Sequence, residues 1–118
     1  MRVQNLTSPR SGGKVANQFK IEGDGGEYFQ SYDSIIAFIS QDPDDNVLVV
    51  GEDYNYSNTT SKYFSQWLRD WGFYDDDIKT LKKELGKLDI GGQFKIKIAY
   101  TEYTVFLTGS VNNWVAYH

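Results

Sequence analysis

The chain has no cysteine and a single histidine, and both absences narrow the chemistry open to it. Without cysteine there can be no disulfide bond and no thiolate metal ligand. The histidine, His118, occupies the last position of the sequence, where side chains are more often disordered than held for catalysis. We therefore expect no catalytic residue, no metal site and no cofactor, and we expect a protein that is not an enzyme.

Long hydrophobic runs are also missing. No apolar stretch approaches the roughly 20 residues that span a bilayer, and the polar beginning of the sequence lacks the apolar segment of a secretion signal. The sequence predicts a cytoplasmic protein with no membrane contact. Its 118 residues, 40% hydrophobic and 16% aromatic, suffice for one compact core. We expect a flexible, basic tail over residues 1–14 and a single domain over residues 15–118.

Positive charge is absent between residues 21 and 61. The same stretch holds nine carboxylates: Glu22, Asp24, Glu27, Asp33, Asp42, Asp44, Asp45, Glu52 and Asp53. Charge segregated in this way favours a positively charged partner, and a protein that binds nucleic acid through Lys and Arg is such a partner. The alternative is a solvated acidic face that only keeps the protein soluble.

The hydrophobic periodicity predicts an α+β fold, in which an antiparallel sheet carries two helices on one face. Five strands are predicted, over residues 15–21, 27–32, 47–50, 94–100 and 103–107. Alternation of apolar and polar residues is clearest over 94–100, whereas residues 47–50 are a continuous apolar run typical of a strand buried on both faces. A short helical segment is expected over residues 35–39. Residues 114–117 are expected to form an edge strand or a packed tail.

Two longer helices are predicted between the third and fourth strands. The first lies within residues 54–72, where aromatic residues and leucine recur with the spacing of one helix face, and one of residues 57–60 is expected to cap it. The second begins among the three aspartates at 75–77, which suit the positive end of a helix dipole. Gly86 is expected as its C-terminal cap.

Two acidic loops and a Ser-Lys pair are the remaining candidates for chemistry. The loops at residues 22–27 and 42–45 offer carboxylate oxygens, but neither has the ligand spacing of a calcium-binding helix–loop–helix. Ser61 and Lys62 could form a hydroxyl nucleophile with a lysine base, yet no second motif supports the pair. A binding function is therefore favoured over catalysis.

Three segments resemble a group of small proteins from phages and mobile elements of Gram-positive bacteria. The shared pattern is NQF, then FQSYxSxIA, then YSxTTxKY, and here it reads NQFKI at residues 17–21, YFQSYDSIIA at 28–37 and YSNTTSKY at 56–63. The resemblance covers about residues 17–68. The group has no defined biochemical activity, so the resemblance implies a genomic context and transfers no catalytic residue. Small acidic phage proteins of this kind include anti-CRISPR proteins, which occupy the nucleic-acid channel of an RNA-guided nuclease.

The resemblance and the charge pattern together predict a phage-encoded inhibitor of a bacterial defence effector, such as an RNA-guided nuclease. Its acidic face would mimic the phosphate charge of DNA in a channel lined with Lys and Arg, and direct binding of nucleic acid is not expected. The two tyrosines of the predicted surface are expected to be exposed and to add contact area. The residues expected to bind the partner are Glu22, Asp24, Glu27, Asp42, Asp44, Asp45, Glu52, Asp53, Tyr54 and Tyr56.

Two alternatives belong to other classes. A basic face could serve a small nucleic-acid-binding or regulatory module, and its residues would be Lys79, Lys82, Lys83, Lys87, Lys95 and Lys97. The chain could instead be a structural or oligomerising phage component, which predicts a defined multimer.

Overall fold

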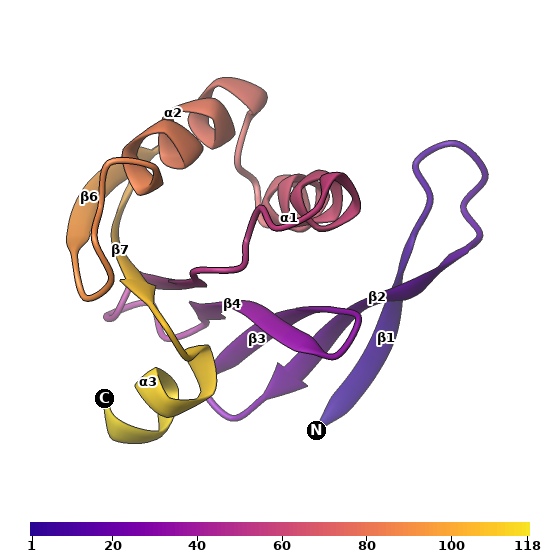
Figure 1. Ribbon diagram of the computed structural model, residues 1–118, viewed down its shortest axis with the longest axis horizontal. Helices are drawn as coiled ribbons and strands as arrows, with labels where there is room; N and C mark the ends of the chain where they lie inside the picture. Colours follow the sequence, from indigo (N-terminus) through magenta and orange to yellow (C-terminus); the bar gives the residue numbers. More distant parts are fainter.

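The computed structural model describes residues 1–118 and is built around one mixed sheet of seven strands (Figure 1). The strands are β1 (Arg2–Thr7), β2 (Lys14–Gly23), β3 (Gly26–Ser31), β4 (Ser34–Ser40), β5 (Val47–Gly51), β6 (Gln93–Ile98) and β7 (Thr101–Thr108). The helices are α1 (Asn58–Asp70), α2 (Asp75–Leu85) and α3 (Val111–Tyr117). The predicted α+β class is confirmed, with two strands and one helix more than expected. None of the three helices is long and apolar enough to cross a membrane.

The spatial order of the strands is β1-β2-β3-β4-β5-β7-β6. All neighbours are antiparallel except β5 and β7, which run parallel because α1, α2 and β6 intervene in the chain between them. The prediction of a purely antiparallel sheet is therefore wrong at this one pair. A parallel pair needs a long crossover connection, and the two helices belong to that connection.

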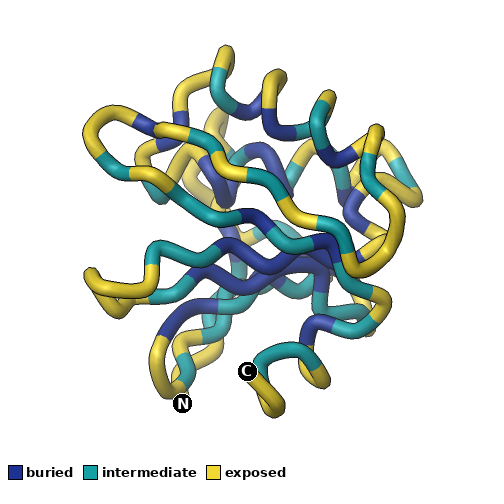
Figure 2. Tube along the Cα trace, turned by 90° about the vertical axis from the view of Figure 1, so that its left-hand side faces the viewer, coloured by how far each residue is buried: buried dark blue, intermediate teal, exposed yellow.

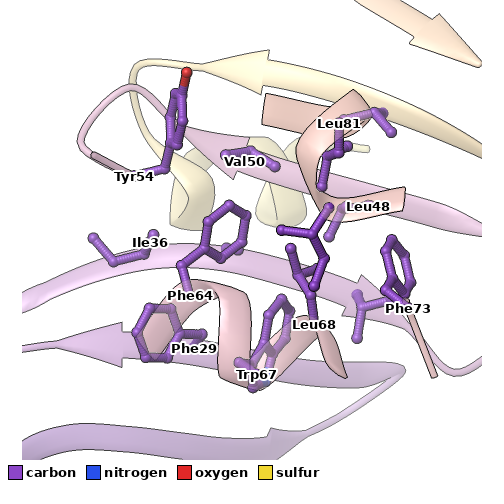
Figure 3. Close-up of a cluster of buried hydrophobic side chains, with 14 of the residues drawn as sticks. Phe29, Ile36, Leu48, Val50, Tyr54, Phe64, Trp67, Leu68, Phe73 and Leu81 are labelled. Carbon is purple, nitrogen blue, oxygen red and sulfur yellow. The ribbon is translucent and has the colours of Figure 1, made fainter. Parts of the chain in front are cut away.

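The helices cover the two faces of the sheet unequally. Figure 1 shows α1 and α2 on one side and the short α3 on the other. The main core lies under α1 and α2, where Phe29, Phe64 and Trp67 are fully buried with ring centroids 6.0 to 6.3 Å apart (Figure 3). Each such side chain contributes about 1.5–3 kcal/mol on burial. A smaller cluster of Phe38, Val49 and Val111 lies under α3.

The two long helices begin and end near the residues that the sequence indicates. The Ser57 hydroxyl caps α1 by accepting a hydrogen bond from the Thr60 amide at 3.1 Å. At the start of α2 the Asp77 carboxylate accepts from the Tyr74 amide at 2.9 Å, and Gly86 follows the last helical residue. These caps satisfy backbone groups that a helix end leaves without partners.

Residues 35–39 form part of strand β4, so the predicted helical segment is wrong. The run is apolar throughout because β4 is central and covered on both faces, with Ile36 and Ile39 in the main core and Phe38 in the smaller cluster. Residues 111–117 form α3 instead of an edge strand or tail, and the Ser110 hydroxyl caps it by accepting from the Asn113 amide at 3.3 Å.

The predicted flexible tail over residues 1–14 is also wrong. Residues 2–7 form β1, which pairs with β2 from Arg2 opposite Glu22 to Asn5 opposite Phe19. Leu6 is only 2% exposed and belongs to the main core. The low apolar content of this segment suits an edge strand, since one buried leucine anchors it and its other residues face solvent. The β1–β2 hairpin loop projects from the body of the molecule (Figure 1).

Candidate functional site

Four exposed aspartates gather at one end of the sheet. Asp24 lies in the β2–β3 turn, and Asp42, Asp44 and Asp45 lie in the β4–β5 loop. The two segments touch, because the amide of the loop residue 41 donates to the carbonyl of the turn residue 25 at 2.9 Å. We call these four aspartates the acidic end. None of the three ion pairs in the structure involves them, so their charge is left to attract an external cation.

Hydrogen bonds inside the β4–β5 loop hold its backbone and two of its three carboxylates. The Asp44 amide donates to the Asp42 carboxylate at 2.9 Å, and the Asp45 amide donates to the Asp42 carbonyl at 3.0 Å. The Ser40 hydroxyl accepts from the Asp42 amide at 3.1 Å and approaches the Asp45 carboxylate at 3.4 Å. Short polar side chains commonly stabilise turns in this way. A partner would therefore meet two carboxylates, those of Asp42 and Asp45, that hydrogen bonds already hold, which lowers the entropy cost of binding.

The other exposed acidic residues of the predicted surface lie at the opposite end of the sheet. Glu52 and Asp53 follow β5, and Asp53 shares a shallow pocket with Asp33 and Tyr56. Strand β4 runs from one end to the other, and its seven residues span roughly 20 Å. The prediction of one continuous acidic face is therefore wrong, because Glu52, Asp53 and Tyr56 are a strand length away from the acidic end.

Two residues predicted at the partner surface are buried instead. Glu27 is 8% exposed, and its Oε1 accepts from the Trp67 indole at 2.8 Å and from the Trp71 indole at 3.1 Å. Tyr54, also 8% exposed, lies with its ring 6.0 Å from that of Phe64 in the core (Figure 3), and burial raises its pKa. Glu27 holds α1 through the two indole groups, and Tyr54 holds the loop before α1 against the core. Neither side chain can therefore reach a partner unless this part of the protein unfolds.

Glu22 remains exposed, but its surroundings are not purely acidic. It lies on β2 just before the turn, opposite Arg2 of β1 and Glu27 of β3. A basic residue is therefore the cross-strand neighbour of Glu22, although the two side chains form no ion pair. Glu22 borders the acidic end on the side of the sheet that carries α1.

A pocket of about 260 Å³ opens beside the acidic end, between the two acidic loops and α3. Asp24 and Asp45 reach it from the turn and the loop, and Trp114 and His118 reach it from α3. The two rings stack in parallel, with centroids 4.5 Å apart and 5° between their planes. Phe38, Val47 and Val115 supply apolar lining. The pocket therefore combines two carboxylates with aromatic and aliphatic surface.

The face of the sheet that carries α3 is only half covered. One row of apolar side chains runs across six neighbouring strands and consists of Val3, Ile21, Tyr28, Phe38, Val49 and Phe106. Helix α3 packs over part of this row, where the ring centroids of Phe106 and Trp114 are 4.9 Å apart. Beyond that helix the row continues over β3, β2 and β1 with no element above it, and Val3 at its end is 57% exposed. Figure 2 colours the trace by burial, and the residues of these strands that point to this side are intermediate or exposed, whereas those that point to α1, such as Phe29, are buried. We call this part of the sheet the open face; its apolar residues are Val3, Phe19, Ile21 and Tyr28.

Four polar side chains, those of Gln18, Ser31, Ser57 and Thr60, gather where the three sequence segments that carry the resemblance meet, and we call this group the polar node. The Ser31 hydroxyl on β3 and the Thr60 hydroxyl on α1 lie 2.8 Å apart, and the Ser57 hydroxyl donates to Thr60 at 3.1 Å. Gln18 is opposite Ser31 on β2, is fully buried, and has no hydrogen-bond partner for either amide atom within the protein. The node lies under the first turn of α1. Hydropathy alone gave no signal for it; the only sequence signal was that its members fall within residues 17–21, 28–37 and 56–63.

Ser61 is paired in space with Lys82 of α2 and not with its neighbour Lys62. The Lys82 amine donates to the Ser61 hydroxyl at 2.8 Å, to the Ser65 hydroxyl at 2.7 Å and to the Ser61 carbonyl at 3.1 Å. Burial and the nearby Arg69 guanidinium lower the pKa of Lys82. An ammonium that uses all three protons is a structural bridge between α2 and α1, and none of the four pockets of the molecule is lined by Ser61, Ser65 or Lys82.

The six lysines of the predicted basic face are divided between different sides of the molecule. Lys82 is half-buried in its bridge. Lys79 and Lys83 are exposed on the outer side of α2, whose inner side packs against the apolar residues of β6, and Lys87 is exposed just beyond the end of the helix. Lys95 and Lys97 alternate with those apolar residues, so they point away from α2, and Lys95 pairs with Glu102 at 3.8 Å. The geometry therefore disfavours a single basic stripe.

The fold defines the chain as an α+β protein on one mixed seven-stranded sheet, in which no three His, Cys, Asp or Glu side chains gather closely enough to hold a metal ion. A model of the family of unknown function DUF8033 matches residues 1–87, and the chain belongs to that family. The matched region includes the acidic end and the polar node and ends after α2, so Trp114 and His118 lie outside it. No curated protein and no solved structure matches the chain.

Proposed function

We propose that this protein inhibits a bacterial defence effector by binding the Lys- and Arg-rich surface with which that effector holds nucleic acid. The observation that carries the proposal is the acidic end, where four exposed aspartates from two touching loops have no basic partner inside the molecule. Such a surface repels nucleic acid and attracts a protein channel built to bind phosphate.

The open face supports a protein partner over a free ion or small ligand. A protein interface usually combines an apolar centre with a charged or polar rim. Here the apolar row over β1, β2 and β3 begins at Tyr28, which packs on Phe38 with ring centroids 4.8 Å apart. Phe38 in turn lines the pocket beside the acidic end. Charge and apolar surface are therefore continuous on this side of the molecule.

The class of target follows from the resemblance to small phage and mobile-element proteins. Such proteins act in the cytoplasm of the bacterial host, and an RNA-guided nuclease offers a basic channel of the required kind. In this proposal the carboxylates of Asp42, Asp44 and Asp45 take the place of backbone phosphates at the channel wall. Electrostatic attraction would chiefly speed association, and the open face would slow release.

The test is an affinity pulldown of the tagged protein from a lysate of a Gram-positive host, at low and at moderate salt, read by mass spectrometry. We expect a nucleic-acid-binding defence protein that is retained at low salt and lost as salt rises. The variant D42N/D44N/D45N should lose most of this target. Asparagine keeps the oxygen that accepts the hydrogen bonds of the loop, so the fold should be unchanged.

A matched control uses the opposite end of the sheet. The variant D33N/E52Q/D53N removes the same number of charges roughly 20 Å away and should retain the target. Equal loss in both variants would reject the acidic end as the binding surface and leave only a general effect of net charge. Recovery of the chain alone, or of nucleic acid, would reject the proposed function.

A further inference from the structure

We propose that the pocket beside the acidic end receives an arginine side chain of the protein partner. This inference rests on the proposed function, because it names the group of the partner that the acidic end binds. It concerns a different set of atoms from the open face, and it can be tested without knowing the partner.

The carboxylates at the pocket are arranged for a cation with several donors. Asp24 belongs to the β2–β3 turn and Asp45 to the β4–β5 loop, and both line the same cavity. Neither makes an ion pair in the structure, and only the Ser40 hydroxyl approaches Asp45. A guanidinium has five N–H donors in a planar fork, so it can reach carboxylates on two segments at once. A lysine ammonium is compact and strongly hydrated, and it would satisfy one of them better than both.

The rest of the lining suits the remainder of an arginine side chain. Phe38, Val47 and Val115 offer apolar surface to the three methylene groups, which arginine often buries along hydrophobic walls. The stacked rings of Trp114 and His118 present a flat aromatic surface at the same cavity. Guanidinium groups stack on such rings and lose less hydration there than an ammonium does. A volume of about 260 Å³ leaves room for the whole side chain.

Other occupants fit less well. A metal ion is disfavoured because Asp24, Asp45 and His118 do not come together as a ligand set. An apolar side chain would leave two carboxylates without compensation as water is excluded. A phosphate or a carboxylate would be repelled by the acidic end. Arginine is also the residue that nucleic-acid-binding surfaces use most often for bidentate contacts, which agrees with the proposed target.

The experiment is an NMR titration of the ¹⁵N-labelled protein with the peptide acetyl-Gly-Arg-Gly-amide. We expect saturable shifts of the Trp114 indole N–H signal and of the backbone amides of Gly25 and Asp45, at peptide concentrations up to about 20 mM, where an affinity near 1 mM approaches saturation. The same peptide with citrulline, which keeps the shape of arginine but has no charge, should cause no saturable shift. A lysine peptide should bind more weakly than the arginine peptide.

Two variants separate the pocket from the general field of the acidic end. D45N removes a charge inside the pocket and should weaken binding of the arginine peptide by about fivefold, the upper range for one exposed ion pair. D44N removes the same charge from a neighbouring residue that does not line the pocket, and it should have a clearly smaller effect. Equal effects of D44N and D45N, binding of the citrulline peptide, or no saturable shift would each overturn the inference.

The outcomes also separate this inference from the proposed function. If the pulldown recovers a salt-sensitive protein target but the arginine titration fails, the proposed function is supported and the arginine site in the pocket is rejected. If the titration succeeds but the pulldown recovers no protein target, the arginine site in the pocket is supported and the proposed function is rejected.

Discussion

At the scale of single residues, the most unusual side chain is the buried amide of Gln18. Both of its polar atoms are shielded from solvent and have no partner within the protein. Leaving a buried polar group unsatisfied costs about 1–3 kcal/mol. We expect Q18M, which keeps the length of the side chain and removes its polar atoms, to raise the free energy of unfolding by about 1 kcal/mol. Urea denaturation followed by fluorescence measures this, and a loss of stability would show that the amide has a role the fold alone does not reveal.

Thr60 provides the comparison within the same polar node. Its hydroxyl is satisfied, because it bonds with both Ser31 and Ser57. We expect T60V, which keeps the shape of the side chain, to lower the free energy of unfolding by about 1–2 kcal/mol, since two hydroxyl groups then lose a partner. The same denaturation series reads both variants. Opposite signs for Q18M and T60V would distinguish the unsatisfied member of the node from the satisfied one.

The Lys82 bridge makes a prediction about pH. Burial, followed by the Arg69 guanidinium, lowers the pKa of Lys82 in the folded chain below the unfolded value of 10.5. Because the unfolded chain then binds more protons, the contribution of Lys82 to the free energy of unfolding rises as the pH increases through the interval between the two pKa values. NMR of the lysine Cε signals should show Lys82 titrating below 10.5. R69Q should move this titration upward, and an unchanged value in R69Q would contradict the assigned charge effect.

At the scale of the elements, the acidic end depends on a close approach of β4 to β3 at Gly26. A Cβ atom on this residue would overlap the Ile39 carbonyl oxygen and the ring of Phe38. We expect G26A to destabilise the fold by about 1–3 kcal/mol, the usual cost of overpacking, and to disturb the turn that carries Asp24. G109A is the matched control, because nothing lies within 4 Å of its new Cβ. Urea denaturation of the two variants tests this, and equal stability would remove Gly26 as a packing constraint.

How far the elements could be predicted depends on whether their signal is local. Helices α1 and α2 were predicted because their apolar spacing and their caps, such as Ser57, lie within a few neighbouring residues. Strand β4 was mistaken for a helical segment because a short, fully apolar run fits either element when both sides are buried. Strand β1 was missed because its order comes from pairing with β2 and from one buried side chain, Leu6. Pairing is tertiary information that composition does not carry.

The residues of the candidate surface also differ in whether local sequence is enough to predict their position. Its exposed aspartates could be found from charge segregation, since loops with turn residues lie on the surface. The burial of Glu27 could not be found in that way, because it depends on two indole groups that lie 40 and 44 residues further along the chain. The separation of Asp53 from the acidic end, by contrast, follows from strand β5 between Asp45 and Glu52, and the predicted strand over residues 47–50 already implies it. Side-chain position in a sheet is decided by register and not by local charge.

At the scale of the whole molecule, the face of the sheet that the helices cover least lies next to the cluster of exposed carboxylates. One face of the sheet is closed by α1 and α2 and carries most of the buried residues. The other face is closed only over β4, β5 and β7, and its open part adjoins the acidic end, whose four aspartates make no ion pair. Surface carboxylates that crowd one another destabilise the folded chain, so such clusters are commonly a compromise between stability and binding.

That compromise predicts how salt acts on the free protein. If the aspartates of the acidic end repel one another, added salt should screen the repulsion and raise the midpoint of thermal unfolding between low and moderate ionic strength. The variant D42N/D44N/D45N should be more stable than the original chain at low salt, and the difference should shrink as salt is added. The control D33N/E52Q/D53N should gain less, because its three charges come from two separate turns, whereas Asp42, Asp44 and Asp45 share one short loop that also touches the turn of Asp24. Calorimetry at two salt concentrations measures this difference. Equal stabilisation of both variants would mean that only the net charge of the protein affects its stability. In that case the aspartates of the acidic end would not repel one another strongly enough for a partner to gain by neutralising them.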